Sequence, residues 1–288
     1  MNTTSRVGKT SLWVAAAVSA LALVLLLGPT AWLLHPWWQA RRRERLRAQP
    51  FPAAWRRILR RRVPLVARLP APLQLRLKRH MQVFLAEKPL IGCQGLVVDD
   101  DMRVAVAAQA CLLLLGHERP DYFPGLRQVL LYPGAFVVDR VQAVGAGVQQ
   151  DQRRVLAGES WQQGQVILSW ADVVQGGAIA DDGRNVVLHE FAHQLDQQTG
   201  AANGAPAQGH PALARRWAQV MSAAYAQLHH TLAQGLPSVL SDYGATDEAE
   251  FFAVATEVFF EQPEALATEY PDLYGELSRH YRLMPLRW

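Results

Sequence analysis

Cysteine is scarce in this chain of 288 residues, which contains only Cys93 and Cys111. Two cysteines cannot build a disulfide framework, and their separation fits neither a CxxC motif nor a zinc ribbon. Cys111 lies in the apolar run 107–115, where a thiol usually behaves as a small hydrophobic side chain. A disulfide framework is therefore excluded, and we assign Cys111 no chemical role.

Acidic residues are almost absent from the first 79 positions, where 16 Lys or Arg accompany the single acid Glu44. This region has a net charge of +15, and because the whole chain has +4, the remainder has −11. Such a separation indicates a basic region that meets a polyanion, joined to an acidic globular domain. A chain of this length, half of it hydrophobic, can bury one substantial core.

Charged residues are missing altogether from Leu12 to Leu34, a run of 23 residues rich in Leu, Ala and Val. At 1.5 Å per residue, a helix of this length crosses a hydrocarbon core of about 30 Å. We therefore expect one transmembrane helix over 12–34. A cleaved signal peptide, whose apolar core has about 7 to 15 residues, and a buried core helix are the alternatives.

Arginines follow the apolar span in two groups. By the positive-inside rule, the first group places the C-terminal side in the cytoplasm, which predicts a single-pass protein of the inner membrane with a cytoplasmic catalytic domain. The second group alternates with apolar residues at helical spacing and is expected to lie on anionic headgroups, with nucleic acid as the less favoured partner. The arginines are Arg41, Arg42, Arg43, Arg45 and Arg47, then Arg56, Arg57, Arg60, Arg61 and Arg62.

The order of elements predicts an α+β fold with a small antiparallel sheet. Two helical segments come first, a β-rich middle follows, and the last hundred residues return to helix. The expected helices cover 73–87, 102–115, 185–197, 212–233, 247–260 and 273–281, and the expected strands cover 129–138, 153–156 and 165–170. The predicted divisions are a tail at 1–11, the span at 12–34, a basic juxtamembrane segment and linker at 35–72, and one domain at 73–288.

The segment 186–195 reads VVLHEFAHQL and contains an HExxH motif. On a helix, the spacing of four puts His189 and His193 on one face, where both can offer an imidazole nitrogen to one metal ion, with Glu190 beside it. Two neutral imidazoles and one carboxylate suit Zn²⁺ and leave a fourth position for water. The sequence therefore predicts a zinc site whose third protein ligand lies elsewhere.

The third ligand is not another nearby histidine, because Asp196 and Thr199 stand where a metzincin has Gly and His. Three carboxylates on the expected helix 247–260 compete for the role: Glu248, Glu250 and Glu257. Glu248 falls in the first turn, where the helix dipole alone favours an acid. Helical spacing cannot separate Glu250 from Glu257, which share a face, and Asp196 is a candidate partner of a ligand imidazole or of backbone.

HEFAHQLD at 189–196 and YGATDEAEFFAVATEVFF at 243–260 resemble the Mlc titration factor A family of zinc-dependent peptidases. LLYPGAFVVD at 130–139 and SWQQGQVILSW at 160–170 extend the resemblance, and the 243–260 motif also resembles the anthrax lethal factor protease domain. The family implies a zincin-like, gluzincin-type domain in which His189, His193 and Glu250 bind one Zn²⁺. It also implies Glu190 as the base and Tyr243 as an active-site hydroxyl, for which a purely structural role is the alternative.

The resemblance implies a peptidase that hydrolyses peptide bonds of a peptide or protein substrate, with aminopeptidase-like activity. The alternative is a membrane-tethered regulator that binds a protein partner such as a transcriptional repressor. The chain departs from lethal factor at Val254, where that protease has an acidic residue that supports the metal ligands.

Overall fold

The structure is a computed structural model that describes residues 34–134, 136–144, 148–156, 158–161, 164–200 and 202–288. The chain divides into two compact units, residues 1–49 and Pro50–Trp288. The described part of the first unit is a helix over 34–48 and the residue that follows it. The second unit contains all the elements discussed below, and the domain divisions expected from the sequence stay predictions.

The expected membrane span and the single-pass location at the inner membrane are corrected by the structure. Among the residues that it describes, no helix is both long enough and apolar enough to cross a membrane. The helix over 34–48 contains the first arginine group, and such charges are costly in hydrocarbon. Residues 12–33 of the expected span lie outside the described residues.

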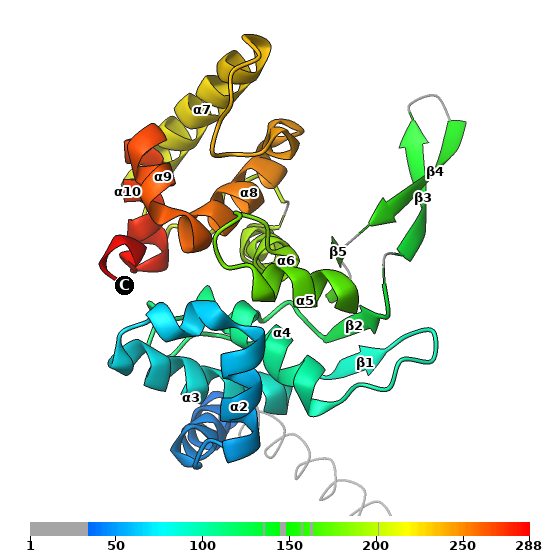
Figure 1. Ribbon diagram of the computed structural model, residues 1–288, viewed down its shortest axis with the longest axis vertical. Coiled ribbons are helices and arrows are strands. Elements are labelled where there is room, and N and C mark those ends of the chain that lie inside the picture. The colour runs from blue at the N-terminus through cyan, green and yellow to red at the C-terminus, as the bar shows by residue number, and fades with distance from the viewer. Residues whose placement is uncertain (1–33, 135, 145–147, 157, 162–163, 201) are drawn as a thin grey trace, which may run out of the picture. The chain divides into compact units, whose positions relative to one another are not determined.

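Helices make up most of the second unit (Figure 1). The six helices expected from the sequence are present, with ends shifted by a few residues at most. The α-helices are α2 (Ala53–Arg62), α3 (Ala71–Glu87), α4 (Asp100–Leu112), α5 (Trp170–Ala178), α6 (Val186–Asp196), α7 (Pro211–Ala233), α8 (Glu248–Glu261), α9 (Pro263–Glu269) and α10 (Pro271–Tyr281). Short 3₁₀ turns are η1 (Pro64–Arg68), η2 (Gln197–Thr199), η3 (Asp242–Ala245) and η4 (Pro285–Arg287).

The main sheet has the strand order β1-β2-β6-β5 and is largely parallel. Strands β1 (Leu90–Gly92), β2 (Gln128–Tyr132) and β6 (Gln165–Ser169) run parallel, and only β5 (Gly158–Trp161) is antiparallel, to β6. Strands β3 (Phe136–Val144) and β4 (Val148–Leu156) form a separate antiparallel pair. The expected α+β fold with a small antiparallel sheet is therefore wrong: the domain is mainly helical, with a small, mostly parallel sheet.

The reason for the parallel pairing is the chain between the strands. Helix α4 lies between β1 and β2 and returns the chain to the starting end of the sheet, as a parallel crossover requires. Between β2 and β6 the chain forms the pair β3 and β4 and then β5, and because β5 runs antiparallel to β6, β6 starts from the same end of the sheet as β2. Periodicity in single strands does not reveal such pairing.

The hydrophobic core surrounds α6. The side chains of Val187, Leu188 and Phe191 are fully buried, and the ring of Phe191 lies 4.8 Å from Phe123 and 5.7 Å from Phe84, centroid to centroid. Helix α8 packs against α6. The helix that bears the HExxH motif is therefore held on several sides by aromatic and aliphatic side chains.

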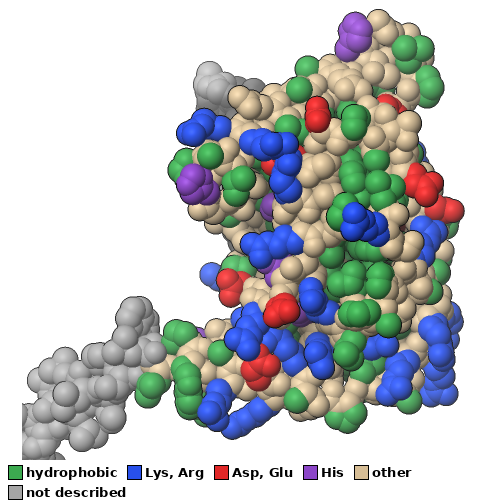
Figure 2. Space-filling view, turned by 90° about the vertical axis from the view of Figure 1, so that its left-hand side faces the viewer, with side chains coloured by type: hydrophobic (Ala, Val, Ile, Leu, Met, Phe, Trp, Pro, Cys, Tyr) green, Lys and Arg blue, Asp and Glu red, His purple; other side chains and the backbone are tan. Residues whose placement is uncertain are grey.

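Helix α2, which contains the second arginine group, packs on α4. Arg61 and Arg62 both bond to Asp101, and Trp55 Nε1 donates to Asp100 Oδ2 at 2.9 Å. Burial raises the pKa of Asp101, but the two guanidinium groups outweigh it and leave the pKa lowered. Figure 2 shows Lys and Arg side chains spread over one face of the molecule, with fewer Asp and Glu side chains between them.

Candidate metal centre

Helix α6 begins at a side-chain cap that sets the position of the HExxH motif. The Asn185 side chain accepts a hydrogen bond from Leu188 N at 3.0 Å, which satisfies one of the free N–H groups of the first turn. With its apolar residues turned into the core, the helix presents His189 and His193 on a common face one turn apart. The two rings lie 4.9 Å apart, centroid to centroid, at 82°.

Helix α8 brings a carboxylate to this face. Asp247 caps the helix by accepting from Glu250 N at 2.9 Å, so that Glu250 lies in a well-defined first turn. Gly244 lies against this helix, and a Cβ at that position would stand 3.3 Å from Val254 Cβ. A side chain at position 244 would therefore be tight against α8 unless Val254 shifted slightly.

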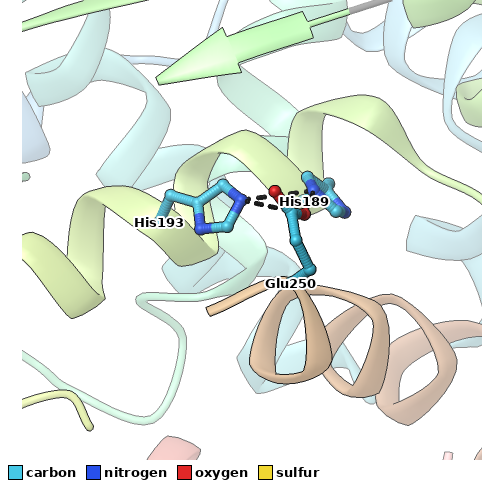
Figure 3. A group of neighbouring side chains, drawn as sticks. All are labelled: His189, His193 and Glu250. Carbon is cyan, nitrogen blue, oxygen red and sulfur yellow. Dashed lines mark hydrogen bonds and ion pairs between the residues drawn. The ribbon is translucent and has the colours of Figure 1, made fainter. Parts of the chain in front are cut away.

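The side chains of His189, His193 and Glu250 converge, as Figure 3 shows. Glu250 Oε2 lies 2.9 Å from His189 Nε2 and 3.5 Å from His193 Nε2. The two Nε2 atoms are 3.2 Å apart. The histidines are 9% and 8% exposed, so the three groups meet in a place that is largely shielded from water.

This donor set fits a single metal ion. Two ligand atoms bound tetrahedrally at about 2.0 to 2.1 Å lie roughly 3.3 Å apart, close to the three separations in the cluster. The lone pairs of two imidazole nitrogens and a carboxylate oxygen that face one another repel unless a proton or a metal cation lies between them. The group offers two N donors and one O donor, a set of protein ligands that can hold a metal ion.

Glu257 lies behind His189, on the opposite side of the ring from Glu250. Its Oε1 is 2.8 Å from His189 Nδ1, and its Oε2 accepts a hydrogen bond from the backbone N–H of Asn185. Since Nδ1 donates to a carboxylate, the Nε2 lone pair is left to face Glu250 and His193. The two glutamates that helical spacing could not separate thus contact different nitrogens of one imidazole.

The electrostatics of the cluster favour a cation. Burial lowers the pKa of His189, but the carboxylates of Glu250 and Glu257, with the charge of Glu190, outweigh it and raise that pKa well above its usual value. Burial raises the pKa of Glu250, yet hydrogen bonds to the two histidines leave it strongly lowered. The raised pKa of His189 means that its surroundings favour a positive charge there, and the lowered pKa of Glu250 means that its carboxylate stays ionised, so a proton or a metal ion between these groups is favoured.

Glu190 and Tyr243, both next to the cluster, differ in their exposure to solvent. Glu190 is 5% exposed and follows His189 on α6. Tyr243, on η3, is 47% exposed, and its ring lies 5.8 Å from that of His189, centroid to centroid. A buried carboxylate and an exposed phenol therefore border the cluster.

Asp196 contacts backbone: its carboxylate accepts from Gly204 N at 2.7 Å and Ala205 N at 2.8 Å. Within the described residues, His193 Nδ1 has no hydrogen-bond partner, so the alternative role of Asp196 is not seen.

Two residues near the cluster were not singled out from the sequence, Asn185 and Glu261. Asn185 Nδ2 donates to Glu261 Oε1 at 3.0 Å and to Gly176 O at 3.2 Å. An Asn before an apolar helical run is a usual cap signal, but nothing local links it to a glutamate 76 positions away.

Comparison with known proteins places these residues in a family. A family model described as glucose-regulated metallo-peptidase M90 matches residues 37–282. An uncharacterised protein of Synechocystis sp. is 40% identical over 270 residues, which cover 93% of this chain and 98% of that protein. Mlc titration factor A of Cronobacter sakazakii is 36% identical over 232 residues, covering 78% and 84%, and that of Salmonella agona is 36% identical over 231 residues, covering 77% and 84%.

Proposed function

This chain belongs to the family of glucose-regulated metallopeptidases M90, and from this premise we propose that it is a zinc-dependent peptidase. His189, His193 and Glu250 would hold the ion. Glu190 would act as general base and Tyr243 as a hydrogen-bond donor to the substrate oxygen. The convergence of two imidazole nitrogens and one carboxylate oxygen within 4.8 Å is the observation that supports this most.

The proposed catalytic role of each side chain follows from its surroundings. A zinc ion bound by three protein groups polarises a carbonyl and lowers the pKa of water at its open position. Glu190 is buried next to His189 on α6 and in this proposal would take a proton from water and pass it to the leaving amine. Tyr243 is exposed where a substrate can reach it and can donate its O–H to the developing oxyanion.

The positions of the carboxylates also support zinc. Glu257 accepts a hydrogen bond from Nδ1 of His189. This bond keeps the Nε2 lone pair available and makes the imidazole a better metal ligand. The remaining position of the ion stays open in this proposal, because the cluster brings together three candidate ligands among the described residues and no fourth. An open position is typical of catalytic rather than structural zinc sites.

Substitution of Glu190 by Gln tests the proposal. We expect E190Q to bind one zinc per chain, measured by elemental analysis, and to lose about 10²- to 10⁴-fold in cleavage of a fluorogenic peptide library. Glu118→Gln, an exposed change elsewhere on the surface, is the matched control and should cleave normally. Undiminished cleavage by E190Q would remove this base from the mechanism.

A regulatory role is the second candidate, because several relatives have the name Mlc titration factor A. In this reading the chain binds a regulatory protein, such as a transcriptional repressor, and peptidase activity is weak or absent. An assay of wild-type protein loaded with zinc distinguishes the peptidase from the regulatory role. If this protein has normal zinc content but cleaves no member of the library, the regulatory role is favoured. The same library, with free and blocked N-termini, tests aminopeptidase-like against internal cleavage.

A further inference from the structure

A second concave site lies at the far end of α8 from Glu250. It is a cleft of about 460 Å³ between the end of α8, the start of α9, η1 and η4. This volume is within the range of clefts that bind small molecules, roughly 300 to 1,000 Å³. Glu261, which lines the cleft, lies eleven positions after Glu250 on α8, so the two places are about 16 Å apart along the helix.

Apolar side chains form about half of the walls of the cleft. Phe260 and Leu65 are buried against it, while Trp288 and Leu286 remain partly accessible beside them. The rings of Phe260 and Trp288 lie 6.1 Å apart, centroid to centroid. An apolar or aromatic group of a ligand would find aromatic surface here.

Glu261 is an unusual group to find in this wall. It is 3% exposed, and its Oε1 accepts one hydrogen bond, from Asn185 Nδ2. Its buried Oε2 meets no donor in hydrogen-bonding geometry among the described residues, although the Arg184 backbone N–H is near enough to favour the ionised carboxylate. A buried carboxyl oxygen without a partner is costly, and a ligand that donates a hydrogen bond would remove that cost.

The charges around Glu261 indicate the sign of such a ligand. Asp181 and Glu264 also line the cleft, against one cation among the described lining residues, Arg68, which keeps its charge while it donates to Ala180 O at 3.1 Å, so that acidic groups outnumber basic ones there. Burial, with the charges of Asp182 and Glu257, raises the pKa of Glu261 to about 8, against the weaker opposing effect of Asn185 and of the Arg184 backbone N–H. A positively charged hydrogen-bond donor next to Glu261 would stabilise its carboxylate, which burial and the neighbouring acids otherwise disfavour.

We propose that this cleft binds a small primary ammonium ligand with an apolar body, whose ammonium group donates to Glu261 and whose body packs on Phe260 and Trp288. An anion would meet Asp181 and Glu264, and a purely apolar molecule would leave Glu261 Oε2 without a donor. The ligand class is therefore an arylalkyl or alkyl amine. The N-terminus of a short peptide with an apolar first residue has the same chemistry.

Binding in the cleft is coupled to His189 by consecutive hydrogen bonds. Glu261 Oε1 accepts from the Asn185 side chain, the Asn185 backbone N–H donates to Glu257 Oε2, and Glu257 Oε1 contacts His189 Nδ1 at 2.8 Å. A ligand that donates a hydrogen bond to Glu261 changes the hydrogen bond between Glu261 and the Asn185 side chain. That side chain also caps α6. This second half of the proposal rests on the proposed role of His189 as a zinc ligand, whereas the cleft itself does not.

Calorimetric titration of the full chain with 2-phenylethylamine tests the cleft, with the uncharged analogue 2-phenylethanol as the matched ligand. We expect the amine to bind at least tenfold more tightly than the alcohol, and Glu261→Gln to abolish that preference. Glu118→Gln should bind as the wild type does. Equal binding of amine and alcohol by wild-type protein, or no binding of either, would overturn the proposal even if E261Q failed to fold.

Zinc affinity, measured by competition with a chromophoric chelator, tests the coupling. We expect a saturating concentration of the amine to change the zinc dissociation constant at least twofold in wild-type protein and not in E261Q. An unchanged constant would overturn the coupling while the calorimetry still decides the cleft. Failure of the chain to bind zinc at all would instead overturn the proposed function, and the amine titration of metal-free protein would remain decisive for the cleft.

Discussion

At the scale of single residues, the site depends on which carboxylate faces which nitrogen of His189. Glu250 approaches Nε2 and Glu257 approaches Nδ1, so one imidazole is held between two acids on the same helix. Glu250 and Glu257 are seven residues apart and lie on one face of α8. In the proposed site, the first would bind the ion and the second would orient His189, which also binds it.

Glu257→Gln should weaken zinc binding without removing it. The amide cannot hold Nδ1 of His189 as a charged acceptor, and loss of such a partner usually costs 10- to 100-fold in metal affinity. Competition with a chelator measures the change, and Glu248→Gln, an exposed residue of the same helix, is the control. Wild-type affinity in E257Q would show that this contact does not support the metal.

Tyr243→Phe should leave zinc content unchanged and lower the rate of the chemical step. Removal of one donor to an oxyanion commonly costs about 10²- to 10³-fold in kcat, with a smaller effect on KM. Steady-state kinetics on a cleaved peptide measures it, with Tyr274→Phe as a control that removes a hydroxyl bonded to Leu286 N. A kcat equal to that of the wild type would assign Tyr243 a packing role.

At the scale of elements, helix ends place the chemistry. The caps Asn185 and Asp247 fix the first turns of α6 and α8, the two helices whose side chains meet. Asn185 differs from an ordinary cap, because its amide also bonds Glu261 and Gly176 O, and its backbone N–H bonds Glu257. The start of the HExxH helix is thus tied to the helix that brings Glu250.

Asn185→Ala should therefore destabilise the domain more than loss of a simple cap. Removal of an exposed cap costs about 1 kcal/mol, and leaving a buried carboxyl without its donor adds about 1 to 3 kcal/mol. Asp99→Ala removes the exposed cap of α4, which bonds Met102 N at 2.9 Å, and is the matched variant. Urea unfolding of both should give a clearly larger loss for N185A, and equal losses would contradict the tied-cap interpretation.

At the scale of the whole molecule, the fold converts distant positions into one binding cluster. His189 and Glu250 are 61 positions apart, and a ligand that joins them stabilises the native state alone, because the unfolded chain does not hold them together. A metal ion bound as proposed would therefore contribute to the stability of the domain as well as to its chemistry.

Removal of zinc by a chelator should lower the melting temperature of the wild type. An ion present at about 1,000 times its Kd contributes about 4 kcal/mol, which corresponds to roughly 8 to 16 °C for a domain of this size. His189→Ala should melt at the same temperature with and without chelator, as followed by circular dichroism. A wild-type melting temperature that does not change when chelator is added would contradict a metal bound in the cluster.

The sequence alone determined the features that depend on local spacing. The helices that contain the HExxH motif and Glu250 were predicted from apolar periodicity and caps, because both signals act within one or two turns. The motifs also indicated the family, which the match over residues 37–282 confirms. Four-residue spacing was enough to put His189 and His193 on a common face.

Only the tertiary structure decided what depends on contacts between distant segments. The parallel pairing of β1, β2 and β6 follows from the path of the chain between the strands. The prediction of an antiparallel sheet was wrong because the sequence of each strand does not reveal this path. The places of Glu250 and Glu257 on opposite sides of the His189 ring, and the bonds of Asp196 to the Gly204 loop, follow from packing of α6 against its neighbours. Hydrophobic periodicity states which face of an element is buried, and packing decides what that face meets.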